Sequence, residues 1–437
     1  MKSFVRKLAY GSGESVPVVA NTVIGLYFLY FLTDIVGMSP AFAGAIFMIG
    51  RSWDAFTDPV MGLISDRTRT KWGRRRPYFL FAALPLCIAY SFLWQEVHLN
   101  EPLTFVYYTL LYMLFMTVMT VYHVPYVSMI TEYSTDYMER TSINNFRIFF
   151  QLFFGLLAAV VPKMIADNSS FSTMALCVGI FILIVALIQF TVTKEGTITA
   201  KVEKINFKVE ISSVFSNRAM RYLLFIYVGC YAAANVIEGF VIYYMKYYLN
   251  REIDMSILFV IVIGAGILSI PIWMKITERI GKKHALIYGL VIWGVGQLGW
   301  LIVAPTSPAY LVYIIGIVVG VGYGVAHVLP WAMLPDVVDI DEIKTGKKRE
   351  GIFSGIMTFF MKLANSIAIF LIGLILEFSG YVANEVQSET TMTVIKWTMV
   401  LAPGIFVVMA LIATVLYPYS REDHKKFRQQ IEENSAI

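Results

Sequence analysis

The sequence predicts an all-α membrane protein with twelve transmembrane helices, arranged as two six-helix bundles related by pseudo-symmetry. Composition is the first reason: 58% of the 437 residues are hydrophobic, only 15% are charged, and the mean hydropathy is +0.67, which is more apolar than soluble domains. The second reason is that apolar runs of about 20 residues, long enough to cross a bilayer, recur along the chain. The third reason is an internal repeat.

The apolar runs give six predicted helices in each half of the chain. In the N-terminal half they span residues 16–36, 40–65, 78–97, 102–130, 142–166 and 171–193. In the C-terminal half they span residues 220–249, 255–277, 284–304, 308–335, 352–378 and 395–418. The polar stretch 194–219 separates the halves, and we expect it to be a cytoplasmic connector. The bundles then cover residues 1–193 and 220–419, and a cytoplasmic tail follows at 420–437.

Loops rich in Lys and Arg alternate with loops that are poor in them. "DRTRTKWGRRRP" and "KTGKKRE" are rich, whereas "EVHLNEP" and "PTSPA" are poor. By the positive-inside rule the rich loops are cytoplasmic, which places both termini in the cytoplasm, as an even number of spans requires. We expect a multi-pass, monomeric protein of the plasma or inner membrane. Because the net charge of +5 is concentrated in these loops, no nucleic-acid partner is indicated.

The two halves repeat each other at corresponding helix ends. Helix 2 ends in "SDRTRTKWGRRRPY" and helix 8 in "TERIGKKHAL", each with an acid, an arginine and then a glycine with basic residues. Helix 4 ends in "YHVPYVSMITE" and helix 10 in "AHVLPWAMLPD", each with a His, a Pro-aromatic pair, a Met and an acid. A duplicated six-helix unit is typical of transporters that bind their solute between the repeats.

The stretch "RSWDAFTDP", residues 51–59, places two acids and an arginine inside the second predicted helix. Asp54 and Asp58 are four residues apart and share one helix face, and Arg51 lies near that face. Each ionisable side chain at membrane depth costs about 2.5–3.5 kcal/mol on insertion scales. Two neighbouring carboxylates also repel each other unless a cation or a proton lies between them. The pattern predicts a cation site with Thr57 as a further oxygen ligand; the alternative is a structural charge cluster held by Arg51.

Several motifs resemble a known family. "GLISDRTRTKWGRRRP" resembles the helix 2–3 signature of the major facilitator superfamily. "RSWDAFTDP", "HVPYVSMITEYSTDYMERTSINNFR" and "LPWAMLPDVVDIDE" together resemble its melibiose-carrier branch, the glycoside–pentoside–hexuronide:cation symporters. The resemblance runs from about residue 10 to residue 362. It implies the major facilitator fold and a symporter that works by alternating access.

The resemblance also implies roles for individual residues. Asp54 and Asp58 would bind the coupling cation, Na⁺ or H⁺, together with Thr57 and with Thr120 on the fourth helix. Thr57 replaces an Asn of the family, which leaves the choice of ion open. Lys362 matches a family lysine that lies close to these acids, and snorkelling to the membrane interface is the alternative. No cofactor besides the coupling ion is expected.

Two histidines and an arginine are the predicted contacts to the solute. His123 and His327 occupy related positions in the two repeats, and Arg147 lies just inside the fifth helix. Core packing is the alternative for the histidines and snorkelling for the arginine. His123 stands where melibiose carriers have a sugar-binding Asp. For a second family acid, on the first helix, the nearest match is Val18, so the family's sugar ligands are missing here.

The basic loop after helix 2 resembles the cytoplasmic clamp of the superfamily. Asp66, Arg74 and Arg75 would pair helix ends in one conformation, and the alternative is that the positive charge only fixes the topology.

We therefore expect a cation-coupled secondary symporter that moves a glycoside or related sugar. Lysophospholipid is the alternative solute, because several motifs also resemble the sodium-dependent lysophospholipid transporters and the spans are rich in Phe, Met and Ile. An uncoupled facilitator or scramblase is a third hypothesis. An enzyme is not expected, because no nucleotide loop, metal cluster or nucleophile–base pair is readable and the connectors are too short for a catalytic domain.

Overall fold

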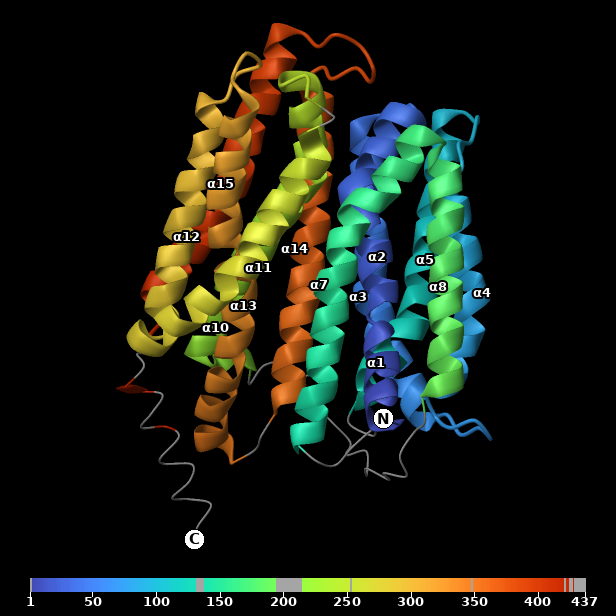
Figure 1. Cartoon of the computed structure of the whole chain (residues 1–437), viewed down its shortest axis with the longest axis vertical. Helices are drawn as coiled ribbons and strands as arrows, with labels where there is room; N and C mark the ends of the chain where they lie inside the picture. The colour runs from blue at the N-terminus through green and yellow to red at the C-terminus, as the bar shows by residue number, and fades with distance from the viewer. Residues whose placement is uncertain are drawn as a thin grey trace. The chain divides into compact units, whose positions relative to one another are not determined.

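The computed structural model describes residues 2–130, 137–193, 214–251, 254–346 and 349–419, together with 422, 423 and 427. Figure 1 shows these parts of the chain as long helices joined by short loops. Most of the predicted connector, residues 194–213, and most of the predicted tail lie outside the described residues.

The first predicted span is a helix that changes its hydrogen-bonding pattern. After α1 (Lys2–Ser12), helix α2 (Ser15–Val23) continues without a break into two π-helical turns, η1 (Ile24–Phe28) and η2 (Phe31–Ile35). The remaining helices of the N-terminal half are α3 (Pro40–Arg67), α4 (Arg76–Leu93), α5 (Glu101–Ser128), α7 (Tyr137–Asn168) and α8 (Phe171–Val192).

The C-terminal half is built in the same way. Its elements are α10 (Arg218–Tyr243), η3 (Tyr244–Tyr248), α11 (Asp254–Ile280), α12 (Lys282–Gly299), η4 (Trp300–Ile302), α13 (Ala309–Thr345), α14 (Glu350–Phe378) and α15 (Glu389–Leu416). Helix α13 extends ten residues beyond the predicted end at 335. It passes through Pro335, continues through a polar segment and stops where Gly346 adopts a left-handed conformation with φ +67°, a usual helix terminator.

Ten helices in the described part of the chain are long and apolar enough to cross a membrane. Helix α3 has a similar length of 28 residues, but its charged side chains lower its hydropathy. Large apolar side chains point outward along these helices, for example Leu268, Ile405 and Phe81. Such broad apolar surfaces suit contact with lipid, so the predicted all-α membrane fold is confirmed.

Contacts divide the chain into two compact units, Met1–Lys201 with Ile369–Glu385, and Val202–Ala368 with Val386–Ile437. In the first unit α3 packs on α5, α4 packs on α5 and α8, and α1 and α2 pack on α7. In the second unit α11 packs on α13, and α12 packs on α13 and α15. The second helix with the fourth, the third with the fourth and the third with the sixth are therefore paired in both units, as a duplicated six-helix architecture requires.

Candidate functional site

A cluster of side-chain oxygen atoms, which we call the cation cluster after its predicted role, lies where α3 packs on α5. The lack of a side chain at Gly50 allows α3 to pack closely on α5, because a Cβ atom at Gly50 would lie 2.2 Å from the Tyr112 ring of α5. One turn further on, Trp53 Nε1 donates to Thr117 Oγ1 at 2.9 Å. Asp54 comes four residues after Gly50 and Asp58 four residues after Asp54, so both acids lie on the helix face of Gly50. Asp54 and Asp58 therefore point towards α5 rather than towards lipid.

Thr120 of α5 joins the two carboxylates. Its Oγ1 lies 2.8 Å from Asp54 Oδ1 and 3.0 Å from Asp58 Oδ1. Thr57 Oγ1 lies 3.3 Å from the same Thr120 oxygen and 3.1 Å from the backbone carbonyl of Asp54. A threonine hydroxyl has one hydrogen to donate, so Thr120 can satisfy only one of the two carboxylates at a time. The four predicted cation residues are thus brought together, with the Thr120 hydroxyl between the two carboxylates.

The cation cluster is largely shielded from water. Asp54 is 6% exposed and the neighbouring Thr120 3%, so water screens the charge of the Asp54 carboxylate poorly. Pro59 inside α3 has no N–H to donate to the carbonyl of Ala55. Among the described residues no three His, Cys, Asp or Glu side chains gather as for a transition metal. Arg51, the predicted neighbour, interacts electrostatically with the Tyr112 hydroxyl.

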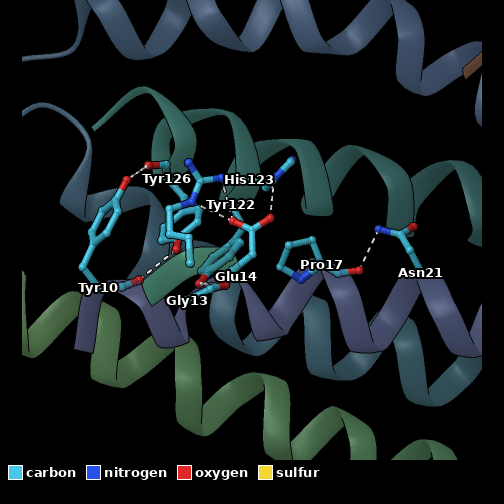
Figure 2. A network of polar contacts seen from close by, with 9 residues as sticks. Tyr10, Gly13, Glu14, Pro17, Asn21, Tyr122, His123 and Tyr126 are labelled. Carbon is cyan, nitrogen blue, oxygen red and sulfur yellow. Dashed lines mark hydrogen bonds and ion pairs between the residues drawn. The ribbon is translucent and has the colours of Figure 1, made fainter. Parts of the chain in front are cut away.

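A second polar cluster, which we call the Glu14 cluster, joins the first span to α5 and α7 (Figure 2). Glu14, in the turn between α1 and α2, accepts hydrogen bonds at Oε2 from Arg147 Nε at 2.9 Å and from Arg147 Nη2 at 2.7 Å. Two glycines of "YGSGE" allow the turn to lie this close to α5 and α7. A Cβ atom on Gly11 would lie 2.8 Å from Phe146, and a Cβ atom on Gly13 would lie 2.5 Å from Tyr126. Arg147 is 15% exposed at its side chain, so it is held inside rather than snorkelling.

The predicted His123 belongs to this second cluster. Its Nε2 lies 4.0 Å from Glu14 Oε1, too far for a direct hydrogen bond but a distance that a bridging hydroxyl can span. Tyr122 donates to the carbonyl of Gly13 at 3.1 Å, and the Tyr10 and Tyr126 hydroxyls each donate to the other's carbonyl. These bonds fix the turn that carries Glu14.

Glu14 is an acid of the first span that was not predicted from the sequence as a site residue. The nearest match to the family acid is Val18, and Val18 instead packs towards Gly155 of α7. Glu14 lies four residues earlier, one turn away on the same face. Asn21 follows on that face; its amide nitrogen donates to the carbonyl of Pro17 at 2.9 Å, and its buried Oδ1 has no protein hydrogen-bond partner.

The two clusters are neighbours because they share α5. Thr120 of the cation cluster and His123 of the second cluster are three residues apart, on one face and about one turn apart along the helix.

The predicted residues of the C-terminal half have different surroundings. The His327 ring of α13 packs against the Tyr231 and Tyr323 rings in tilted arrangements, with its centroid 4.3 and 4.9 Å from theirs. Trp331 donates from Nε1 to the Tyr231 hydroxyl at 3.0 Å. These contacts fit the packing alternative for His327. Lys362 is half-buried on α14, and its pairing with the acids of α3 stays a prediction.

The predicted clamp residues lie together at the end of α3. Asp66 Oδ1 is 3.1 Å from Arg75 Nη2 and 3.7 Å from Arg74 Nη2. The second unit has a related pair, Lys282 with Asp336 at 2.7 Å. The clamp role itself stays a prediction.

Comparison with known proteins identifies the chain. Residues 9–421 match the family described as MFS/sugar transport protein. The chain belongs to this family. The predicted membership of the major facilitator superfamily, in its melibiose-carrier branch, is therefore confirmed.

Relatives of this MFS protein are symporters. The uncharacterized symporter sll1374 of Synechocystis sp. is 28% identical, over 98% of this chain and 96% of that protein. Sodium-dependent lysophosphatidylcholine symporter 1-A of Danio rerio is 27% identical, over 98% and 88%. The inner membrane symporter YicJ of Escherichia coli is 26% identical, over 98% and 95%.

Solved structures agree on the fold of this MFS protein. The nucleoside transporter NupG gives a TM-score of 0.68 at 14% identity, covering 96% of this chain and all of that chain. A bacterial homolog of the human lysosomal transporter Spinster, in an inward-facing and unoccupied conformation, gives 0.69 at 12% identity, covering 98% of each. The protein is therefore a multi-pass membrane transporter of the symporter type and, as predicted, not an enzyme.

Proposed function

We propose that this protein is a Na⁺-coupled symporter for a glycoside or related sugar. The observation that carries the proposal is the position of Thr120 Oγ1 within 3.0 Å of both Asp54 and Asp58. Asp54 is buried and Asp58 half-buried, so their negative charges repel each other, and a cation bound between them lowers that repulsion. Na⁺ suits this set of hard oxygen ligands, and H⁺ on one carboxylate is the alternative.

The second cluster supports a solute rich in hydroxyl groups. Glu14 offers an acceptor and Arg147 offers donors. Between Glu14 Oε1 and His123 Nε2 there is a 4.0 Å gap that a sugar hydroxyl can bridge. Asn21 Oδ1 adds a buried acceptor without a protein hydrogen-bond partner. A sugar hydroxyl there would satisfy an atom whose burial otherwise costs about 1–3 kcal/mol.

In the proposed cycle, Na⁺ binds first and draws Asp54, Asp58 and Thr120 together. This fixes the face of α5 that also carries His123, so the solute meets an ordered site. The loaded protein then changes access from one side to the other, as in repeat-built transporters. We place the protein as a monomer in the plasma or inner membrane, with both termini in the cytoplasm, because the Lys- and Arg-rich loops fall on that side.

Uptake into proteoliposomes under imposed Na⁺ or pH gradients tests the cation site. A panel of glycosides, uronides and lysophospholipids should contain a solute whose uptake a Na⁺ gradient accelerates. Asp54→Asn and Asp58→Asn should abolish that acceleration. Glu96→Gln is the control: it removes an exposed carboxylate in the loop after α4 and should leave uptake unchanged. Equal uptake by Asp58→Asn and wild type would support an uncoupled facilitator instead.

A lysophospholipid is the second candidate solute, because a sodium-dependent lysophosphatidylcholine symporter is similar over nearly the whole chain. The zwitterionic headgroup also offers a phosphate for Arg147 and a cation for Glu14. The double variant Glu14→Gln/Arg147→Gln separates the candidates without leaving one buried charge unpaired. The neutral amides keep hydrogen bonds to sugar hydroxyls, so glycoside uptake should fall only partly, whereas lysophospholipid uptake should be lost.

A further inference from the structure

An apolar groove lies on the outer surface of the second unit, between α10 and α15. It has a volume of about 380 Å³, within the range of small-molecule sites. Tyr222 and Phe225 of α10 form one side; Ile405, Val408, Met409, Ile412, Ala413 and Leu416 of α15 form the other. The wall is thus apolar apart from one tyrosine hydroxyl, which suits a hydrocarbon chain.

Two arginines lie at one end of this groove. Arg218, Arg221, Tyr222 and Phe225 occupy positions i, i+3, i+4 and i+7 of α10, so they form a single stripe. The Arg218 guanidinium carbon lies 5.9 Å from the centroid of the Tyr222 ring, which itself lines the groove. Both arginines are exposed. Basic groups at the end of a membrane span attract the anionic headgroups of lipids.

We propose that this groove binds one anionic glycerophospholipid. Its phosphate contacts Arg218 and Arg221, and one acyl chain lies along the α15 wall towards Ile405. All residues of this groove belong to the second unit, whereas the residues of the cation and Glu14 clusters belong to the first. A lipid held here bridges α10 and α15, the first and last helices of its unit, and stabilises their packing.

Lipid binding to the purified, delipidated full-length chain tests the proposal. Native mass spectrometry would count bound dioleoyl phosphatidylglycerol and dioleoyl phosphatidylcholine, and thermal unfolding would report their stabilisation. We expect one tightly bound phosphatidylglycerol and weaker phosphatidylcholine. Arg218→Gln/Arg221→Gln should weaken phosphatidylglycerol binding by roughly tenfold or more, since each basic group contributes about 1 kcal/mol near a charged surface, and should leave phosphatidylcholine unchanged.

Three further variants make the result specific. Val408→Trp fills the groove from an exposed position and should weaken both lipids. Lys275→Gln removes an equally exposed positive charge elsewhere on the same unit and should change nothing. Arg218→Lys/Arg221→Lys keeps the charge and should keep the phosphatidylglycerol preference, which also controls for misfolding. Wild-type phosphatidylglycerol binding by either Arg218→Gln/Arg221→Gln or Val408→Trp would overturn the proposal.

Discussion

Thr120 is the residue on which the proposed cation site depends most directly. Its hydroxyl is within hydrogen-bond distance of both predicted acids, and it also has a lone pair to offer a bound ion. We predict that Thr120→Val weakens Na⁺ binding by about tenfold or more, the scale of one lost charge-assisted contact of about 1.5–3 kcal/mol, and that Thr120→Ser restores it. Na⁺ titration followed by thermal stabilisation measures the effect.

Thr117→Val is the control for that experiment. Thr117 lies one turn away on α5, donates to the carbonyl of Met113 and accepts from Trp53. Thr117→Val removes the same kind of hydroxyl group, but from a position whose hydrogen bonds are to Met113 and Trp53 rather than to the two acids. Equal loss of Na⁺ affinity in both variants would mean that helix packing, rather than ligation by Thr120, determines the affinity.

Asp34 at the end of the first span gives a second prediction for a single residue. It is 5% exposed, and its Oδ2 accepts hydrogen bonds from Tyr381 at 2.6 Å and from Thr33 at 2.7 Å. Tyr381→Phe removes one donor to a buried carboxylate, so we expect a loss of about 1–3 kcal/mol in stability. Thermal unfolding should show it, while Tyr310→Phe, at a tyrosine that is 64% exposed, should leave the midpoint where it was.

Sequence reasoning reached some site residues and missed others for identifiable reasons. Asp54 and Asp58 were predictable because charge inside an apolar helix is costly and the spacing fixes the face, whereas Thr120 was predicted only from the family resemblance. Glu14 was missed because it precedes the predicted start of the first helix. In addition, the family acid of this helix was matched to Val18, which lies one helical turn after Glu14. A buried arginine needs an acidic partner, and asking for the partner of Arg147 is the signal that points to Glu14.

At the scale of helices, the contact between α3 and the C-terminal part of α14 rests on glycine. A Cβ atom on Gly373 would lie 2.3 Å from the backbone oxygen of Pro40, and one on Gly44 would lie 3.1 Å from Phe370. The second half of α14 therefore clusters with the N-terminal helices rather than with its own half of the sequence. The hydropathy of the sequence predicts a span at 352–378, but it does not show which helices pack against the first and the second half of that span.

Substitution at two glycines of α14 tests this contact. Gly373→Ala forces backbones apart, and we expect it to destabilise the protein by about 1–3 kcal/mol, as overpacking does. Gly355→Ala on the same helix meets nothing within 4 Å. It should be neutral or stabilise by up to about 1 kcal/mol through helix propensity. Chemical or thermal unfolding compares the two, and equal midpoints would show that the glycine contact contributes little.

Helix boundaries were predictable where composition changes sharply and less so where it does not. The predicted span 171–193 ends within one residue of α8, because polar residues follow at once. Helix α13 extends past its prediction because prolines such as Pro335 are tolerated inside membrane helices, so a proline is a weak stop signal there. Helix α15 begins at Glu389, six residues before prediction, with Ser388 as its N-cap accepting from Thr391 N at 3.1 Å.

For the whole molecule, the proposed mechanism requires that two ligands act on one shared element. The cation cluster and the Glu14 cluster both use α5, through Thr120 and His123. If Na⁺ orders that face for the solute, the solute must order it equally for Na⁺, because coupling between binding sites is reciprocal. We predict that each ligand raises the affinity of the other by the same factor, in the range of about 5–150-fold that coupled sites usually show.

Calorimetry on the purified protein measures both changes in affinity. Na⁺ is titrated with and without the solute found in the uptake panel, and the solute is titrated in Na⁺ or in choline. Asp58→Asn should bring the factor close to one while solute still binds, because the Glu14 cluster is intact. Glu96→Gln, which removes an exposed carboxylate in the loop after α4, should keep the wild-type factor. A wild-type factor of one at every pH would mean that the oxygen cluster of α3 and α5 is a structural charge arrangement, and that the protein moves its solute without coupling to a cation.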